Sequence, residues 1–168
     1  MLPQKRPGLG NMFHNGNATI LGATMAAAWL AIAGPALADP PVLGPFTYDG
    51  SQGHDQDTPV GKYRQILKTP TATLQELEVH VTTLNPGQWS HQPHHHYNEE
   101  LVIIRQGTVE TLSGGVWKRL GPGSFIFNAS NSVHALRNVG DTAAIYDVVA
   151  WTPKGAPPGA NTPIAAGQ

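Results

Sequence analysis

The amino-acid sequence predicts an all-β protein, a single sandwich or barrel of short strands. Glycine and proline are both abundant, with 19 and 15 in 168 residues, which favours many strands and turns. Short apolar runs with an alternating pattern recur between turn signals, and no stretch has a convincing helical period. Six to eight such strands fit one barrel and exclude βαβ folds and helical bundles.

The N-terminus is predicted to be a signal peptide. Two cations precede a mainly apolar run at 20–33, and an A-x-A cleavage signal ends at Ala38. As a helix this run spans only ~21 Å, short of the ~30 Å hydrocarbon core of a bilayer. We therefore expect cleavage of 1–38, a periplasmic or secreted protein, and no stable membrane span afterwards. An uncleaved anchor stays open as the alternative, and a start at Met12 would leave the apolar run intact.

The mature chain is expected to be one domain with extensions. An extended arm covers 39–60 with a short edge strand near 46–48, a barrel covers 61–152, and a Pro/Gly/Ala-rich tail at 153–168 is expected to be disordered. The strands expected in the barrel are 63–67, 73–84, 101–105, 108–112, 116–120, 124–127, 133–138 and 143–151.

The longest of these strands, 73–84, alternates strictly between two faces. One face is apolar, and the other carries the polar side chains of Glu76, Glu78, His80 and Thr82. We expect the polar face to be solvated. If it lines the barrel instead, its residues become candidates for acid–base chemistry.

Composition narrows the function classes. Charged residues are 12% of the chain and the net charge is −1 with neutral histidine, so no nucleic-acid partner is expected. The chain has no cysteine, which excludes disulfides, thiolate ligands and a cysteine nucleophile. Any metal site must therefore use imidazole and carboxylate groups.

A histidine-rich stretch, HHHYNEELVIIRQG at 94–107, is the strongest functional signal. His94 and His96 project from one face of a strand, and Glu100 has the same parity. Six residues of extended chain cover ~20 Å, whereas metal ligands lie ~2.0–2.2 Å from the ion. The chain must therefore fold back at 97–99 if Glu100 is to join the two histidines, and Asn98 suits such a turn.

His134 is the fourth candidate ligand, carried by a later strand. Three imidazoles and one carboxylate suit a divalent first-row metal such as Fe, Mn, Ni, Cu or Zn. Four protein ligands on a six-coordinate ion leave two positions for water, dioxygen or a chelating substrate.

These residues resemble the first conserved motif of the cupin superfamily, which His94, His96, Glu100 and Gly107 match in spacing. Gly87 matches the leading glycine of that motif, with one extra residue before the first histidine.

The segment at 123–138 resembles the second cupin motif, with Gly123, His134 and Asn138 in register. It departs at Ala129, where proline is usual, and at Asn131, where glycine is usual. Asn131 can supply the left-handed backbone that glycine would.

The resemblance implies a small single-domain cupin of the type-2 kind. Its fold would be a jelly-roll barrel, often dimeric, with a metal inside at one end held by His94, His96, Glu100 and His134.

Three neighbouring side chains are expected to stand outside the ligand set. His95 and Glu99 have the opposite strand parity, and His91 is expected in a loop with a lesser role at the entrance. Phe125 and Phe127 are expected in the barrel core.

The candidate catalytic residues are Glu100, His80 and Arg137, the last of which fits either a surface charge or an anion clamp. We favour a metalloenzyme acting on a small molecule by oxygenase, isomerase, decarboxylase or hydrolase chemistry. The alternative is a non-catalytic binding module whose metal fixes a ligand or braces the barrel, and a weaker one is metal storage.

Overall fold

A computed structural model describes residues 41–157 and 162–163, and the described residues belong to one compact unit. The predicted signal peptide with its cleavage point after Ala38, and most of the predicted tail, lie outside the described residues. Within them, no helix has the length and apolar character needed to cross a membrane.

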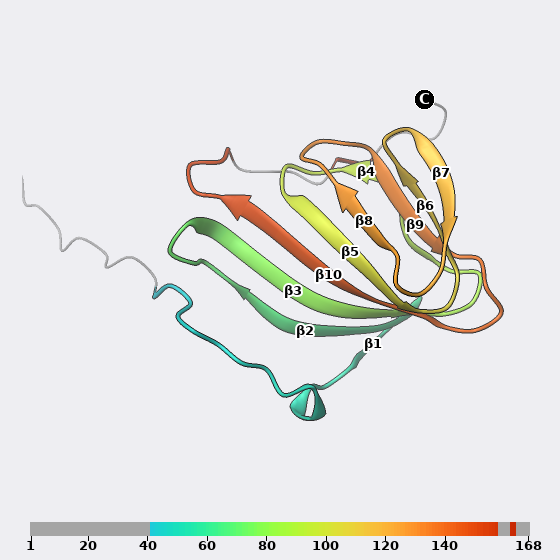
Figure 1. Ribbon diagram of the computed structural model, residues 1–168, viewed down its shortest axis with the longest axis horizontal. Coiled ribbons are helices and arrows are strands. Elements are labelled where there is room, and N and C mark those ends of the chain that lie inside the picture. The colour runs from blue at the N-terminus through green and yellow to red at the C-terminus, as the bar shows by residue number, and fades with distance from the viewer. Residues whose placement is uncertain (1–40, 158–161, 164–168) are drawn as a thin grey trace, which may run out of the picture. The chain divides into compact units, whose positions relative to one another are not determined.

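The described chain is built almost wholly of β-strands, joined by short turns (Figure 1). The elements, in chain order, are the 3-10 turn η1 (Gly50–Gln52), β1 (Gln56–Thr58), β2 (Gly61–Thr69), β3 (Leu74–Leu84), β4 (Trp89–His95), β5 (Glu99–Gln106), β6 (Val109–Ser113), β7 (Val116–Leu120), β8 (Phe125–Asn128), β9 (His134–Asn138), β10 (Ala144–Pro153) and β11 (Thr162–Pro163).

Two antiparallel sheets make up the unit. One has the strand order β1-β2-β3-β10-β5-β8 and the other the order β11-β4-β9-β6-β7. Chain neighbours such as β4 and β5 lie in different sheets, which is the connectivity of a jelly roll. The predicted all-β jelly-roll barrel is therefore confirmed.

Turn chemistry ends the strands where the sequence indicated. Gly107, between β5 and β6, has φ 82°, and a Cβ there would lie 2.7 Å from the Cα of Ala144. Only glycine fits such a left-handed position against a neighbouring strand. Asn131 has φ 58°, so it supplies the left-handed conformation predicted for it.

The core lies between the two sheets. Its buried members are Leu84, Val102, Ile104, Val109, Ile126, Leu136, Ala144, Tyr146 and Val148. Asn138 is buried among the strand ends, where its side-chain amide donates to the carbonyls of Leu84 and Thr142, both at 2.8 Å. Five core residues also line the cavity described below, so the core forms the base of the site.

Two expectations about the strands are wrong. The edge strand of the arm is β1 at Gln56–Thr58, and 46–48 is not a strand. Phe125 and Phe127 are not core residues, since they are 73% and 49% exposed on the outer face of their sheet. Ile126 between them points inward and is buried. The predicted alternation is present, but Ile126, and not the two phenylalanines, occupies the inner face.

Candidate metal centre and the cavity around it

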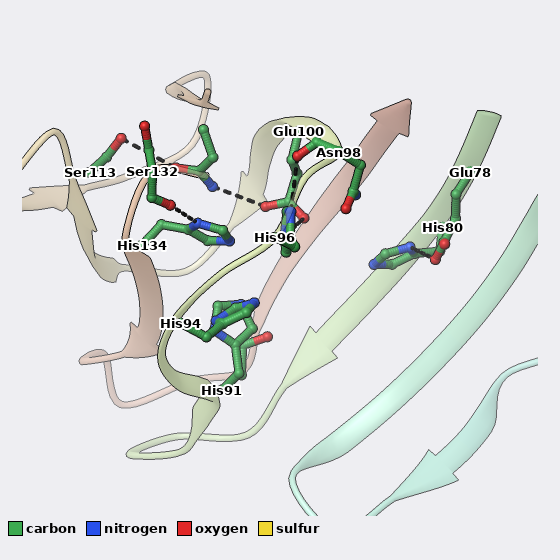
Figure 2. A network of polar contacts seen from close by, with 12 residues as sticks. Glu78, His80, His91, His94, His96, Asn98, Glu100, Ser113, Ser132 and His134 are labelled. Carbon is green, nitrogen blue, oxygen red and sulfur yellow. Dashed lines mark hydrogen bonds and ion pairs between the residues drawn. The ribbon is translucent and has the colours of Figure 1, made fainter. Parts of the chain in front are cut away.

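A cavity of about 370 Å³ opens between the two sheets. Its lining residues come from β3, β4, β5, β9 and β10, among other elements. His91, His94, His96 and His134 gather on one side of it (Figure 2).

His134 is the most deeply placed of these histidines. It begins β9, is 2% exposed, and its Nδ1 lies 2.8 Å from the carbonyl oxygen of Ser132. A carbonyl oxygen only accepts, so Nδ1 carries the hydrogen and Nε2 keeps its lone pair. Nε2 is buried and has no hydrogen-bond partner among the described residues. Buried polar atoms are nearly always paired, so this lone pair indicates a position for a ligand.

His96 stands beside His134, with ring centroids 4.6 Å apart. β4 ends at His95, the chain bends at Tyr97 and Asn98, and β5 begins at Glu99. The bend that the ligand hypothesis requires is therefore present. The His96 Nδ1 lies 2.9 Å from the Asn98 carbonyl oxygen, which closes the bend and leaves Nε2 for the cavity.

Glu100 reaches the same place from β5. Its Oε2 lies 4.0 Å from the His96 Nε2, and its Oε1 accepts a hydrogen bond from the Asn128 amide at 3.0 Å. Asn128 is itself buried and in turn accepts from the Ser113 hydroxyl at 3.2 Å. This chain of hydrogen bonds fixes the orientation of the carboxylate, as outer partners do for metal ligands.

His94 and His91 lie together on β4, with ring centroids 3.9 Å apart. The Nδ1 atoms of both face the carbonyl oxygen of Gln92, at 3.1 and 3.4 Å. The register of β4 against β9 shifts between Trp89 and His91 and again between His91 and His94. These bulges break the alternation of the strand and bring both side chains into the cavity.

The potential ligand atoms form two groups that share His134. One group is His96, Glu100 and His134, the other is His91, His94 and His134, and within each group the atoms lie within 4.8 Å of one another. Three of the sequence-predicted ligands, His96, Glu100 and His134, therefore fall in one group, and His94 falls in the other together with His91. In each histidine a backbone carbonyl occupies Nδ1, so Nε2 is the common ligand atom.

The electrostatics favour neutral imidazoles. Burial lowers the pKa of His91 to about 3, and burial also lowers the pKa of His94 and His134, assisted by the neighbouring histidines. Neutral imidazole is the form that binds a metal. The donor set of imidazole nitrogens and one carboxylate fits a divalent first-row ion.

Other candidate residues fall outside this cluster. His95 belongs to neither group, and its Nδ1 is buried without a partner among the described residues. Glu99 is half-buried and accepts a hydrogen bond from the Trp151 indole at 2.8 Å.

Arg137 lies away from the cavity. It stacks on Trp89 and Trp117, 5.0 and 5.7 Å from the ring centroids, and its Nε donates to Glu110 at 2.8 Å. The structure therefore favours a surface charge over an anion clamp inside the barrel.

Sequence reasoning missed two parts of the site. His91 is expected in a loop but lies on β4. Pro93 is the signal of such an irregular strand, because proline lacks a ladder donor and occurs at edges and bulges. The polar face of β3 was expected in solvent, yet Glu76, Glu78, His80 and Thr82 line the cavity. No signal in the alternation itself distinguishes the inner face from the outer face.

Comparisons with known proteins agree with this architecture. Residues 80–151 match the sequence profile of the family described as "Cupin domain". No curated protein sequence matches the chain significantly.

Three solved structures illustrate the similarity of the fold. An RmlC-like cupin from Shewanella frigidimarina is 18% identical, with a TM-score of 0.54 over 67% of this chain and 95% of that one. The polyketide cyclase RemF from Streptomyces resistomycificus is 17% identical, with a TM-score of 0.54 over 73% and 89%. KdgF from Halomonas sp. is 19% identical, with a TM-score of 0.52 over 61% and 92%.

Proposed function

The chain belongs to the cupin superfamily, and from that premise we propose that it is a metal-dependent enzyme acting on a small molecule inside its barrel. The observation that carries the proposal is the lone pair on the His134 Nε2, buried, unpartnered and aimed at a cavity. Three more candidate ligands surround it, His96 and Glu100 in one group with it and His94 in the other.

The proposed ligands are His94, His96, Glu100 and His134, and the ion is Fe, Mn, Ni, Cu or Zn. A divalent ion held there would supply Lewis-acid activation or dioxygen binding. The role of the chain is to keep the imidazoles of His94 and His134 neutral by burial, and to orient the Glu100 carboxylate through Asn128. RemF, named as a polyketide cyclase, supports the idea that this fold can host catalysis.

The first experiment measures the metal content of the full chain purified from its own compartment. We expect about one ion per chain, lost in His134→Ala. A protein without bound metal would remove the proposal, whereas two or more tightly held ions would favour storage that also uses His91 and His95.

Turnover separates the enzyme from a binding module. The metal-loaded chain is assayed with diols, flavonoids, aromatic acids and keto acids, and the Glu100→Gln variant is assayed beside it. If the variant binds a ligand normally while a measurable reaction disappears, the binding-module alternative fails. If the loaded chain turns over none of the panel, the enzyme proposal is heavily weakened.

We also propose export, with removal of residues 1–38 and a periplasmic or secreted mature protein. The apolar run at 20–33 and the A-x-A signal ending at Ala38 support this proposal. Mass spectrometry of the protein recovered outside the cytoplasm checks it. An intact N-terminus on the membrane-associated protein would favour the anchor instead.

A homodimer and the absence of a nucleic-acid partner remain predictions. Light scattering of the purified chain measures the oligomeric state, and gel retardation with a DNA fragment measures nucleic-acid binding. We expect two copies in solution and no retardation at physiological salt.

A further inference from the structure

The wall of the cavity opposite the histidine cluster is also polar. Lys68 on β2 and Glu76, Glu78, His80 and Thr82 on β3 line the same cavity as the candidate metal ligands. Placing ionisable groups inside a barrel costs free energy unless they are paired, so their arrangement needs an explanation.

Glu78 is the centre of this wall. Its Oε1 lies 3.0 Å from the His80 Nδ1 and accepts from the Tyr63 hydroxyl at 3.3 Å, while its Oε2 accepts from the Lys68 Nζ at 2.6 Å. The hydrogen bond from His80 and the one from Lys68 lower the pKa of Glu78 to about 2. The carboxylate therefore remains ionised under all ordinary conditions.

An ionised carboxylate only accepts, so the hydrogen of neutral His80 lies on Nδ1. This leaves a lone pair on Nε2, and the hydrogen bond of the His80 ring among the described residues is made by Nδ1. Figure 2 shows one edge of the His80 imidazole against Glu78, while the opposite edge points toward the side of the cavity that holds the histidine cluster. The Tyr63 ring packs against the imidazole with centroids 4.8 Å apart, which holds its plane.

The charges of the lining limit the ligand. The cavity holds three carboxylates, Glu76, Glu78 and Glu100, and one lysine that is paired with two of them. A divalent cation at the histidine cluster makes this set formally neutral. No arginine of the described chain lines the cavity, and three of them pair with acids elsewhere. An uncharged ligand with oxygen atoms for the ion suits this lining, whereas a phosphate or polycarboxylate lacks a free cation.

We propose that His80, positioned by Glu78, is a proton-transfer residue for an uncharged hydroxy-carbonyl compound bound at the histidine cluster. The idea rests on the proposed function. The Nε2 atom takes a proton from the carbon next to the carbonyl, and the electron pair of that C–H bond moves onto the carbonyl oxygen. The proton then returns from Nε2 to the same carbon, or to the former carbonyl carbon while the hydroxyl hydrogen moves to the former carbonyl oxygen, so no oxidant or reductant is consumed. The imidazolium formed in between is stabilised by the Glu78 carboxylate.

The test uses dihydroxyacetone and acetoin as probes, in deuterium oxide, with the full chain loaded with Zn²⁺. Zinc is diamagnetic, so proton NMR can follow the replacement of hydrogen by deuterium next to the carbonyl. We expect exchange faster than with the free ion, and a fall of about 100-fold or more in His80→Gln and His80→Asn. Glu78→Gln should lower kcat about 10-fold with KM unchanged. Glu110→Gln, an acid-to-amide change on the outer face of the barrel, is the matched control and should exchange as the wild type does.

A second readout does not depend on turnover. Nitrogen-15 NMR of the histidine side chains should show His80 with its hydrogen on Nδ1 in the wild type, and a mixture of tautomers in Glu78→Gln. A wild-type His80 with its hydrogen on Nε2 overturns the proposal, as does exchange that survives both His80 substitutions in folded, zinc-loaded protein. Absence of exchange with both probes overturns it as well. In each case a chain that still binds one zinc ion, and loses it in His134→Ala, leaves the proposed metal centre standing, whereas a chain that binds no zinc removes both.

Discussion

The two walls of the cavity stabilise their buried ionisable groups in different ways. On one wall Lys68 supplies the positive charge, and it pairs with Glu76 and Glu78 at 3.3 and 2.6 Å. On the other, Glu100 faces histidines that burial keeps neutral, and the His134 Nε2 has no partner. On one wall the charges of Lys68, Glu76 and Glu78 are paired within the chain, and the other wall presents imidazole lone pairs that suit an external cation.

The same burial has different consequences on these walls because the partners differ. Desolvation lowers the pKa of His91, His94 and His134, which have no counter-ion strong enough to offset it. Glu78 is also desolvated, yet hydrogen bonds from His80 and Lys68 outweigh that effect and lower its pKa. Whether buried ionisable groups form a metal site or a structural ion network therefore depends on their hydrogen-bond and charge partners, and not on burial alone.

The largest expected effect is a loss of metal binding, and we expect it only from substitutions on the wall that carries the histidine cluster. His134→Ala should weaken zinc binding by more than about 100-fold, because removing even an outer partner of a ligand costs about 10- to 100-fold. His80→Gln, on the opposite wall, should change the affinity by less than about 3-fold. Competition with a chromogenic chelator measures both, and equal losses in the two variants would contradict the division between the walls.

Metal should also stabilise the fold through the histidine wall. At a free zinc concentration 100 times the Kd, the free energy of unfolding should rise by about 2.7 kcal/mol. Urea unfolding with and without zinc measures the gain, and a chelator should reverse it. The gain should vanish in His134→Ala and persist in Glu78→Gln, whose own stability is lower for a different reason.

Glu78→Gln should reduce the stability of the metal-free chain by about 1–3 kcal/mol, because Lys68 and His80 lose a buried acceptor. The pKa of Glu78 is about 2 in the folded chain against an ordinary value of 4.5, so its ionised form is the stabilising one. This contribution is fully present above about pH 4.5 and is lost as the pH falls towards 2. Urea unfolding at pH 7, 5, 4 and 3 should show the two proteins converging at low pH. A constant difference would mean that the charge of Glu78 does not matter.

The two overlapping ligand groups can be separated by single substitutions. With the proposed ligand set, Glu100→Gln should weaken zinc binding about 10-fold and His91→Gln less than about 3-fold. Titration calorimetry compares them. The reverse order would assign the ion to His91, His94 and His134.

The smallest effect is expected outside the cavity. Arg137→Gln removes the stacking on Trp89 and Trp117 and the partner of Glu110, so stability should fall by about 1 kcal/mol. Zinc affinity should not change, as chelator competition can verify. A loss of zinc binding would show that Arg137 acts on the site, as one sequence-based reading allowed.

Residues close together in the sequence determined the strands, the turns and the bend between two of the candidate ligands. Alternating apolar residues and turn residues defined the strands, and the chain does bend at Tyr97 and Asn98 between two of the candidate ligands. Asn131 adopts the left-handed backbone that a turn in that loop requires, with φ 58°. These features depend on residues close in sequence, so the sequence carries them.

Tertiary structure decided which face of each strand points into the barrel. Parity separates Glu78 and His80 from Val79, and Phe125 and Phe127 from Ile126, but it is symmetric between inside and outside. Packing of one sheet against the other breaks that symmetry, and it turned His80 in and both phenylalanines out.

The position of His91 is another feature that the local sequence does not determine. Its place beside His94 follows from bulges in β4, which arise from pairing with β9, whose paired residues lie 40 or more positions later in the sequence. The sequence thus determined the strands, the turns and the types of ligand atoms by itself. The partnership of strands distant in sequence determined which side chains share the cavity, because register and facing are properties of the assembled sheets.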